Sequence, residues 1–413
     1  MLRTRRELLR RSLPLFAGLA AGLKVSPAEL SDQLARAMEA RVLKTELFPS
    51  PVRISSVELL RVGSHSLVRV RAADGTTGYS AAQGPVMSVT YPIFVHRVAP
   101  GFVGKDAREL ESLLSDVYLA NSNYKWQGLA FWVSVAAIEI AILDLLGKVV
   151  GKPLGELLGK VVRREIKVYR ASEKRGNSPE AEIEYLQKLV SETGAEAIKF
   201  RLGGRMRYHD ASTKRDLSLI PLTRKVFGEA MTIYADANGS YDVPMALRIG
   251  RLMEEQKFGF FEEPVPFDYY DETRQIAKAL KIPIALGEQE MSLRGFRRII
   301  ETGTARVIQP DLLYFGGIIR SLKVARMAQA AGLDCTAHMS GGGLGYLYVA
   351  HFASCVPNAG PHQEYKGEEE GLPVMSDSSS LKSVKGVLKV PTGPGLGITL
   401  DPDFLKKATP VTA

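Results

Sequence analysis

Four short apolar segments that each end in a carboxylate constrain what this chain can fold into. Their sequences are TIYADAN, FGFFEEP, IPIALGE and ARVIQPD, and their acids follow one another at intervals of 23 to 26 residues. Helical patterns separate the segments, which predicts β-strands joined by crossover helices. Strands of a parallel sheet all point the same way, so the residues that close them gather at one end. Those residues are Asp236, Glu262, Glu288 and Asp311.

Carboxylates gathered in this way would repel one another without a cation between them. Mg2+ prefers a few carboxylate oxygens and keeps its remaining octahedral positions for water and substrate. We therefore predict a Mg2+ site held by Asp236, Glu262 and Glu288. Glu263 follows Glu262 directly and should point to the other side of its strand, which makes it a weaker candidate. Any one of these acids alone could equally cap the next helix.

The length of the chain, 413 residues, suits a barrel of roughly 250 residues with an accessory domain. An alternating β/α rhythm begins near residue 165. Strands are expected at 165–171, 196–201, 232–238, 258–264, 282–288, 305–311, 334–340 and about 358–365. Eight such strands predict a closed barrel.

The region before the barrel has a different pattern. Residues 52–80 alternate apolar and polar side chains about an Asp74-Gly75 turn, which indicates a hairpin. Residues 78–106 lose periodicity and carry several glycines and prolines, as a long loop would. A helix at 128–149 is apolar on almost every face and is expected to be buried between domains. The expected units are a signal and linker at 1–45, an N-terminal domain at 46–165, the barrel at 166–365 and a segment at 366–413 that returns to the N-terminal domain.

The first 24 residues combine an arginine-rich start with an apolar run that is too short to span a bilayer comfortably. The segment Thr4–Arg10 resembles the twin-arginine export signal. It predicts a periplasmic protein that is not stably inserted in the membrane after processing. The alternative is a basic amphipathic helix that lies on the protein or on a membrane surface. The protein would be cytoplasmic if the signal does not function.

Charge and cysteine content exclude some classes of partner and architecture. The net charge is +9, but five of the positive charges are arginines within the first eleven residues, so the rest of the chain is only mildly basic. Nucleic acid is therefore not an expected partner, whereas an anionic substrate is compatible. The two cysteines, Cys335 and Cys355, stand in apolar runs and are expected to be buried thiols rather than a disulfide framework.

The second barrel strand ends in Lys199-Phe200-Arg201, and period-two alternation places Lys199 and Arg201 on the same side, toward the barrel mouth. A lysine crowded by a divalent metal and a second cation should have a lowered pKa and could act as a base. An arginine stays protonated and suits a bidentate contact with a substrate carboxylate. The alternative is that both are solvated charges at a strand end.

His338 closes the seventh strand and Asp311 closes the sixth, so their side chains are expected to be neighbours at the same mouth. The aspartate would fix the imidazole tautomer and stabilise the imidazolium after proton uptake, which is what a general base needs. A lone histidine in an apolar run is more often structural. His351 and His362 lack such a partner in the sequence, and we expect structural roles for them.

These residues together give a resemblance that covers about residues 50 to 400. It rests on the segment Ala136–Lys148 with the following Gly-Lys-Pro-Leu, the three metal acids, the 27-residue step from Asp311 to His338, and Pro394–Gly397. The chain resembles the enolase superfamily, and more closely its mandelate racemase-like branch. The resemblance implies a modified TIM barrel of the (β/α)7β type with an N-terminal α+β capping domain whose loops, here 78–106, close the barrel. It also implies that Glu364, which ends the eighth strand, hydrogen-bonds the substrate carboxylate as an electrophile.

Arg201 and Asn238 are predicted to bind a small carboxylate substrate, and a homo-oligomer is expected. The second-strand motif of this branch is usually Lys-x-Lys, whereas Arg201 replaces the second lysine here. A racemase needs bases on both faces of the α-carbon, so the arginine weakens that reading, whereas a dehydratase can work from one face. Residues 203–216 form a charged, glycine-rich insertion that the pattern does not explain and that could line the mouth or serve assembly.

The first functional hypothesis is therefore a Mg2+-dependent dehydratase of a sugar acid, with Lys199, His338, Asp311 and Glu364 as catalytic residues. The alternative is a racemase or epimerase of a 2-hydroxy acid. A non-catalytic sugar-acid binding protein, a cycloisomerase and a dipeptide epimerase are further alternatives. The last two usually place lysines on both the second and the sixth strand, and the sixth strand here ends in Asp311.

Overall fold

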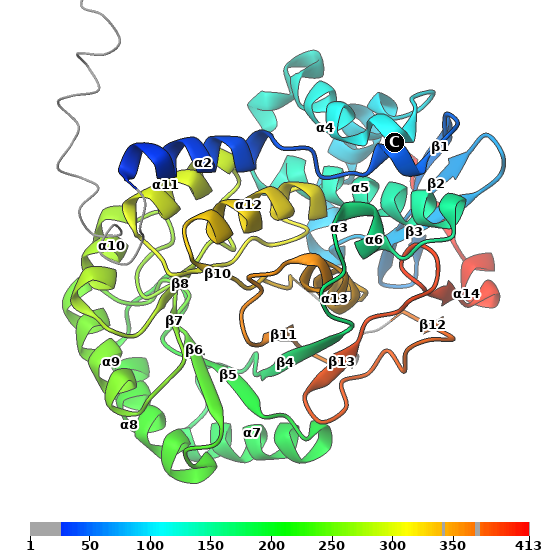
Figure 1. Cartoon of the computed structure of the whole chain (residues 1–413). Coiled ribbons are helices and arrows are strands. Elements are labelled where there is room, and N and C mark those ends of the chain that lie inside the picture. The colour runs from blue at the N-terminus through cyan, green and yellow to red at the C-terminus, as the bar shows by residue number, and fades with distance from the viewer. Residues whose placement is uncertain (1–25, 341–342, 368–371, 413) are drawn as a thin grey trace, which may run out of the picture.

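The structure is a computed structural model that describes residues 26–340, 343–367 and 372–412. A barrel of parallel strands packs against a second part built from antiparallel strands and helices (Figure 1). The predicted export signal lies outside the described residues and stays a prediction.

The barrel consists of parallel strands that are hydrogen-bonded in the order β10-β9-β8-β7-β6-β5-β4-β11. The strands are β4 (Glu165–Ala171), β5 (Ala197–Arg201), β6 (Thr232–Asp236), β7 (Phe261–Glu262), β8 (Ile284–Leu286), β9 (Val307–Ile308), β10 (Asp334–Cys335) and β11 (Gln363–Tyr365). A parallel bridge between Cys335 and Ala359 joins β10 to the segment that leads into β11 and closes the ring. The predicted eight-stranded barrel is confirmed.

One helix follows each strand from β4 to β10 in the described chain, and these helices surround the barrel (Figure 1). They are α7 (Pro179–Thr193), α8 (Asp210–Phe227), α9 (Val243–Glu255), α10 (Tyr270–Ala279), α11 (Leu293–Thr302), α12 (Ile318–Ala330) and α13 (Gly345–Cys355). The arrangement is the (β/α)7β barrel that the resemblance implied.

Alternation along the strands separates the outer wall of the barrel from its interior. In β5, Ile198 and Phe200 belong to a hydrophobic cluster that includes side chains of the surrounding helices. The opposite face of the strands carries a smaller cluster in which the rings of Tyr234 and Phe260 stack with centroids 4.1 Å apart. Lys199 points to this same face, and its Nζ lies 5.0 Å from the centre of the Tyr169 ring. Aromatic rings therefore form a floor beneath the polar residues of the barrel interior.

The N-terminal part contains a sheet with the strand order β15-β1-β2-β3. Its strands are β1 (Ile54–Val62), β2 (His65–Ala72), β3 (Thr77–Ala81) and β15 (Thr409–Pro410), and its helices are α3 (Gly84–Ile93), α4 (Leu110–Leu119), α5 (Leu129–Val150) and α6 (Leu154–Leu158). The predicted Asp74-Gly75 turn joins β2 to β3. The α+β capping part is therefore present, and it packs beside the barrel (Figure 1).

Helix α5 is long and apolar enough to cross a membrane by length and composition alone, but 89% of its most apolar stretch is buried inside the protein. Its two acids bind backbone groups of other segments. Glu139 accepts hydrogen bonds from the backbone N–H groups of Ile318 and Ile319 at the start of α12. Asp144 accepts from the backbone N–H groups of Tyr79 and Leu396. The predicted buried helix thus ties the capping part to the barrel and to the C-terminal segment.

The C-terminal segment folds back as expected. β15 pairs with β1 of the capping sheet, and β13 (Val387–Lys389) pairs with β4 of the barrel. β12 (Val374–Met375) pairs with β14 (Thr399–Leu400). A short helix, α14 (Pro402–Lys406), was not expected in this turn-rich sequence. The limits of the domains at residues 45, 165 and 365 stay predictions.

One sequence prediction about a loop is wrong. Residues 78–106 form most of β3, then α3 and several short helical turns rather than a long loop. Pro85 stands in the first turn of α3, where a missing N–H costs nothing, so the proline signal was misleading. The expected linker before residue 45 contains α2 (Pro27–Glu39), which packs against α12 and begins with a capping box made by Ser26 and Glu29. Cys335 and Cys355 are buried free thiols, as predicted.

Candidate active site and metal centre

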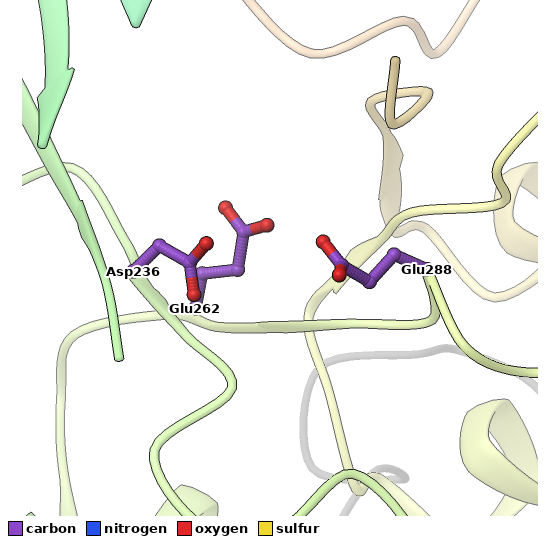
Figure 2. Close-up of side chains that lie close together, drawn as sticks. All are labelled: Asp236, Glu262 and Glu288. Carbon is purple, nitrogen blue, oxygen red and sulfur yellow. The ribbon is translucent and has the colours of Figure 1, made fainter. Parts of the chain in front are cut away.

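Three acids converge where the barrel strands end (Figure 2). Asp236 and Glu262 are direct partners in the β6–β7 register, and Glu288 follows two residues after the end of β8. All three are buried, and one carboxylate oxygen of each lies within 4.8 Å of the others. Figure 2 shows the Glu288 carboxylate facing those of Asp236 and Glu262. The predicted convergence of these acids is confirmed.

The chemistry of this triad fits a hard divalent cation. Glu262 Oε1 is buried and has no hydrogen-bond partner among the described residues. Buried carboxylates without compensating partners are costly, and a cation bound between them removes that cost. Glu263 lies outside the triad, as expected, and its carboxylate accepts a hydrogen bond from Asn238 Nδ2 at 3.3 Å.

Lys199 lies beside the triad and is fully buried. Its Nζ is 2.7 Å from Glu262 Oε2 and 3.1 Å from Glu364 Oε1. Burial alone would lower the pKa of Lys199, but these two carboxylates outweigh it and raise the pKa well above its usual range. The expected lowering of this pKa assumed a bound divalent metal and stays a prediction. Among the chain's own groups, Glu262 and Glu364 act in the opposite direction.

Arg201 faces the same interior, and it is paired in register with Asp236. Its guanidinium forms a short ion pair with Asp236 Oδ2 and a second ion pair with Glu173 Oε1 at 2.8 Å. Asn238 donates its backbone N–H to Asp236 Oδ1 at 2.7 Å and lies at the mouth of the barrel. Both predicted substrate-binding residues therefore border the metal acids.

The predicted histidine–aspartate pair is present. His338 Nδ1 lies 2.6 Å from Asp311 Oδ2, and Nε2 lies 3.0 Å from Glu288 Oε2. Asp311 Oδ1 accepts from the backbone N–H groups of Leu313 and Tyr314, so the carboxylate is fixed in place. Burial would lower the pKa of His338, but the nearby carboxylates raise it to about 9. A cation bound at Glu288 would cancel part of this attraction and favour the neutral ring that a base requires.

Glu364 is the middle residue of β11 and lies between the two predicted bases, Lys199 and His338. Its Oε2 accepts the backbone N–H of Met339 at 2.8 Å and lies 3.7 Å from His338 Nε2. Burial would raise the pKa of Glu364, but Lys199, Lys366 and His338 hold it well below its usual range. The expected role as a hydrogen-bond donor to the substrate needs a protonated carboxyl, so the charges of the chain alone do not favour that role.

A cavity of about 160 Å³ opens beside these groups at the mouth of the barrel. His338 and Glu288 line it together with Arg201 and Asn238. The further lining residues are Glu173, Arg175, Arg205, Tyr314, Ser340 and Lys366. Lys199 is buried against Glu262 and Glu364, so His338 is the better placed of the two predicted bases to reach a molecule in the cavity.

Comparison with known families agrees with this geometry. Residues 37–159 match the family described as mandelate racemase / muconate lactonizing enzyme, N-terminal domain, and residues 181–404 match the family described as enolase C-terminal domain-like. The two matches cover the capping part and most of the barrel. The chain is a mandelate racemase/muconate lactonizing enzyme-like member of the enolase superfamily.

Named relatives of this superfamily member are similar over most of its length. Arabinonate dehydratase of Saccharolobus solfataricus is 28% identical over 342 residues, which are 80% of this chain and 87% of that protein. D-galactonate dehydratase of Xanthomonas oryzae pv. oryzae is 28% identical over 350 residues, which are 83% of this chain and 90% of that protein. A mandelate racemase/muconate lactonizing protein from Paracoccus denitrificans, solved in complex with magnesium, is 28% identical and superposes with a TM-score of 0.80 over 87% of this chain and 99% of that chain. The chain is therefore an enzyme.

The residues that line the cavity of this superfamily member are not all those expected from the sequence. The described residues that line it come from the barrel, and the segment 78–106, which was expected to close the barrel, contributes none of them. Arg175, Tyr314 and Lys366 also line the cavity but were not predicted from the sequence. Lys366 directly follows β11, whereas Arg175 and Tyr314 lie within the loops after β4 and β9. The rule that strand-end residues meet at one mouth could have identified Lys366, two residues beyond Glu364. The insertion supplies Arg205, which supports the expectation that it lines the mouth.

His351 and His362 lie away from the cavity. His351 is buried in α13, with Nε2 at 3.1 Å from the carbonyl oxygen of Leu396, and burial lowers its pKa to about 4. His362 Nδ1 lies 3.0 Å from the hydroxyl of Tyr234, which belongs to the aromatic floor. Both contacts are structural.

The buried neutral imidazole of His351 predicts a loss of stability in acid. The unfolded chain binds the proton below its ordinary pKa of 6.5, whereas the folded chain does so only near 4. Stability from this residue is complete above pH 6.5 and falls as the pH decreases toward 4, by about 2 kcal/mol between pH 7 and pH 5. Denaturant unfolding of the parent and of His351→Gln at both pH values measures this loss, which the variant should lack. Equal pH slopes for the two proteins would contradict it.

Proposed function

We propose that this enzyme is a Mg2+-dependent dehydratase that converts a sugar acid to a 2-keto-3-deoxy acid. The observation that carries the proposal is one imidazole base, His338, at the cavity wall, with Arg201 at the position where a racemase would need a second base. Support also comes from the two relatives named as dehydratases of arabinonate and D-galactonate. The racemase or epimerase alternative is less well supported, because an arginine does not release its proton near neutral pH.

The acids Asp236, Glu262 and Glu288 would hold the cation. When bound, Mg2+ would act as a Lewis acid toward the substrate carboxylate and stabilise the negative charge of an enediolate. The cationic Lys199, fixed by Glu262 and Glu364, would add positive charge on the same side of the barrel interior. Arg201 is paired with Asp236 and Glu173, and it would orient the carboxylate through the N–H groups that these pairs leave over.

His338 would remove the α-proton, and Asp311 would stabilise the resulting imidazolium. The C2–H bond breaks and its electron pair forms the enediolate. The imidazolium then returns a proton to the 3-hydroxyl, so that the C3–O bond breaks and water leaves. The enol product tautomerises to the 2-keto-3-deoxy acid. One residue would thus serve both proton transfers, which a syn elimination allows because both leaving groups lie on the same face.

A panel of aldonic and aldaric acids tests this function directly. Keto product, detected by carbonyl derivatisation, should form from at least one acid in the presence of Mg2+ and should disappear with excess chelator. Saturable binding without any product over the whole panel would contradict the dehydratase and favour a binding protein instead.

A further inference from the structure

Two guanidinium groups at the cavity have no carboxylate partner in the described part of the chain. Arg175 follows β4, and its Nη1 donates to the carbonyl oxygen of Leu202 at 2.5 Å, while its Nη2 donates to Asn238 Oδ1 in a short hydrogen bond. Arg205 follows β5 and has an exposed side chain. Neither guanidinium lies within 4.0 Å of a described carboxylate. Both therefore keep their charge available to an anion in the cavity.

The other two cations of the cavity wall are already paired. Arg201 binds Asp236 and Glu173, and Lys366 lies 3.6 Å from the same Glu173 carboxylate. Burial, followed by the charges of Arg201 and Arg205, lowers the pKa of Arg175 to about 10, although the charges of Glu173 and Asp216 act in the opposite direction. The guanidinium groups repel one another, and an anion bound between them would relieve that repulsion.

Hydrogen bonds fix the backbone of the insertion at Arg205. The N–H of Arg205 donates to Ser240 Oγ at 2.9 Å, and the N–H of Met206 donates to the carbonyl oxygen of Asn238 at 2.8 Å. Arg205 and Met206 both have a φ of 55°, which non-glycine residues rarely adopt without such support. These contacts hold the backbone in an unfavourable conformation that places Arg205 at the mouth of the cavity.

We propose that the substrate carries a second anionic group, remote from the carboxylate that reacts, and that Arg175 and Arg205 bind it. The inference deepens the proposed function and rests on it. The reacting end is positioned by the metal acids and His338, whereas the two arginines stand on the loops after β4 and β5. Guanidinium groups bind carboxylates and phosphates in the same bidentate manner. The remote group is thus a second carboxylate, as in an aldaric acid, or a terminal phosphate.

The test compares three acids of the same sugar configuration: the aldonic acid, the aldaric acid and the terminally phosphorylated aldonic acid. Values of kcat/KM for keto-acid formation give the preference during turnover. Calorimetric titration of the same acids into Mg2+-loaded His338→Asn protein gives the preference in binding alone. We expect the acid with a remote anion to be preferred over its aldonic counterpart at least tenfold in both measurements, and the preferred acid identifies carboxylate or phosphate as the remote group.

Substitution of Arg175 and Arg205 then tests whether these two residues cause the preference for an acid with a remote anion. Arg205→Met and Arg175→Met should each reduce it by roughly 10- to 100-fold, the range for loss of a charge-assisted hydrogen bond. Arg207→Met, two residues further along the same segment at a separate hollow, is the matched control and should keep the preference. Arg205 is exposed, so its variant should fold even if Arg175→Met does not.

Two outcomes would overturn the inference: aldonic acids bound and converted as well as acids with a remote anion, or an unchanged preference in Arg205→Met. The proposed function can fail separately. If no acid gives keto product, the binding titrations still show whether a remote anion is recognised through Arg205.

Discussion

Asp236→Asn and Glu288→Gln should each abolish turnover while leaving the fold intact. Each change removes one ligand charge from the triad, whose oxygens lie within 4.8 Å of one another. A Lewis acid that stabilises developing charge contributes several kcal/mol, so turnover should fall by roughly 10³-fold or more. Without metal, the variants should keep the fold but be somewhat less stable than the parent, because Asp236→Asn removes the ion pair with Arg201 and Glu288→Gln removes the contact with His338.

Thermal unfolding with and without Mg2+ measures the effect on stability, and a turnover assay under the same two conditions measures the loss of activity. The parent should gain stability with Mg2+, by about 2.7 kcal/mol at a hundredfold excess over the dissociation constant, and the two variants should not. Asp242→Asn is the matched control, because it makes the same chemical change at the N-cap of α9, outside the triad. If the parent protein has the same stability and activity in Mg2+ and in excess chelator, the predicted metal site is wrong.

His338→Asn should lose turnover by roughly 10²- to 10⁴-fold, the range typical of general acid–base groups, or more because both proton transfers depend on it. The asparagine leaves the triad and Arg201 in place, so the variant should still bind a sugar acid in calorimetric titration. His362→Asn is the matched control, because His362 contacts Tyr234 at the aromatic floor and not the cavity. If His338→Asn exchanges the α-proton and eliminates at the parent rate, His338 is not the base.

Lys199→Met separates the two candidate bases. If Lys199 only stabilises the enediolate, α-proton exchange in this variant slows and keeps its stereochemical sense. If Lys199 is the base, exchange disappears in this variant and persists in His338→Asn. The structure favours the first result, because Lys199 is fully buried and fixed by two carboxylates, whereas His338 lines the cavity.

Sequence periodicity was sufficient to predict the barrel and the convergence of its strand-end acids. Parallel strands must end at one mouth, so a carboxylate at the end of each strand predicted the triad and the contact between His338 and Asp311. Alternation within β5 placed Lys199 and Arg201 on the inner face for the same reason. These predictions depend only on strand direction and on period two, which local sequence specifies.

Properties that depend on contacts between loops could not be predicted in this way. The pKa of Lys199 depends on Glu364, which is 165 positions away in sequence and adjacent only in the closed barrel. Segment 78–106 contains glycines and prolines, which usually indicate a loop. The sequence alone did not show that these residues are compatible with the helix α3. Arg175 and Arg205 lie in loops whose course depends on hydrogen bonds to Leu202, Asn238 and Ser240.

Product analysis in deuterated water distinguishes a dehydratase from an epimerase in one experiment. The best sugar acid of the panel is incubated with the parent protein and Mg2+, and the products are followed by proton NMR. We expect a 2-keto-3-deoxy acid whose new C3 hydrogen derives from solvent, with no accumulation of the C2 epimer. Recovery of both C2 epimers carrying deuterium, with no keto acid, would contradict the dehydratase and establish an epimerase.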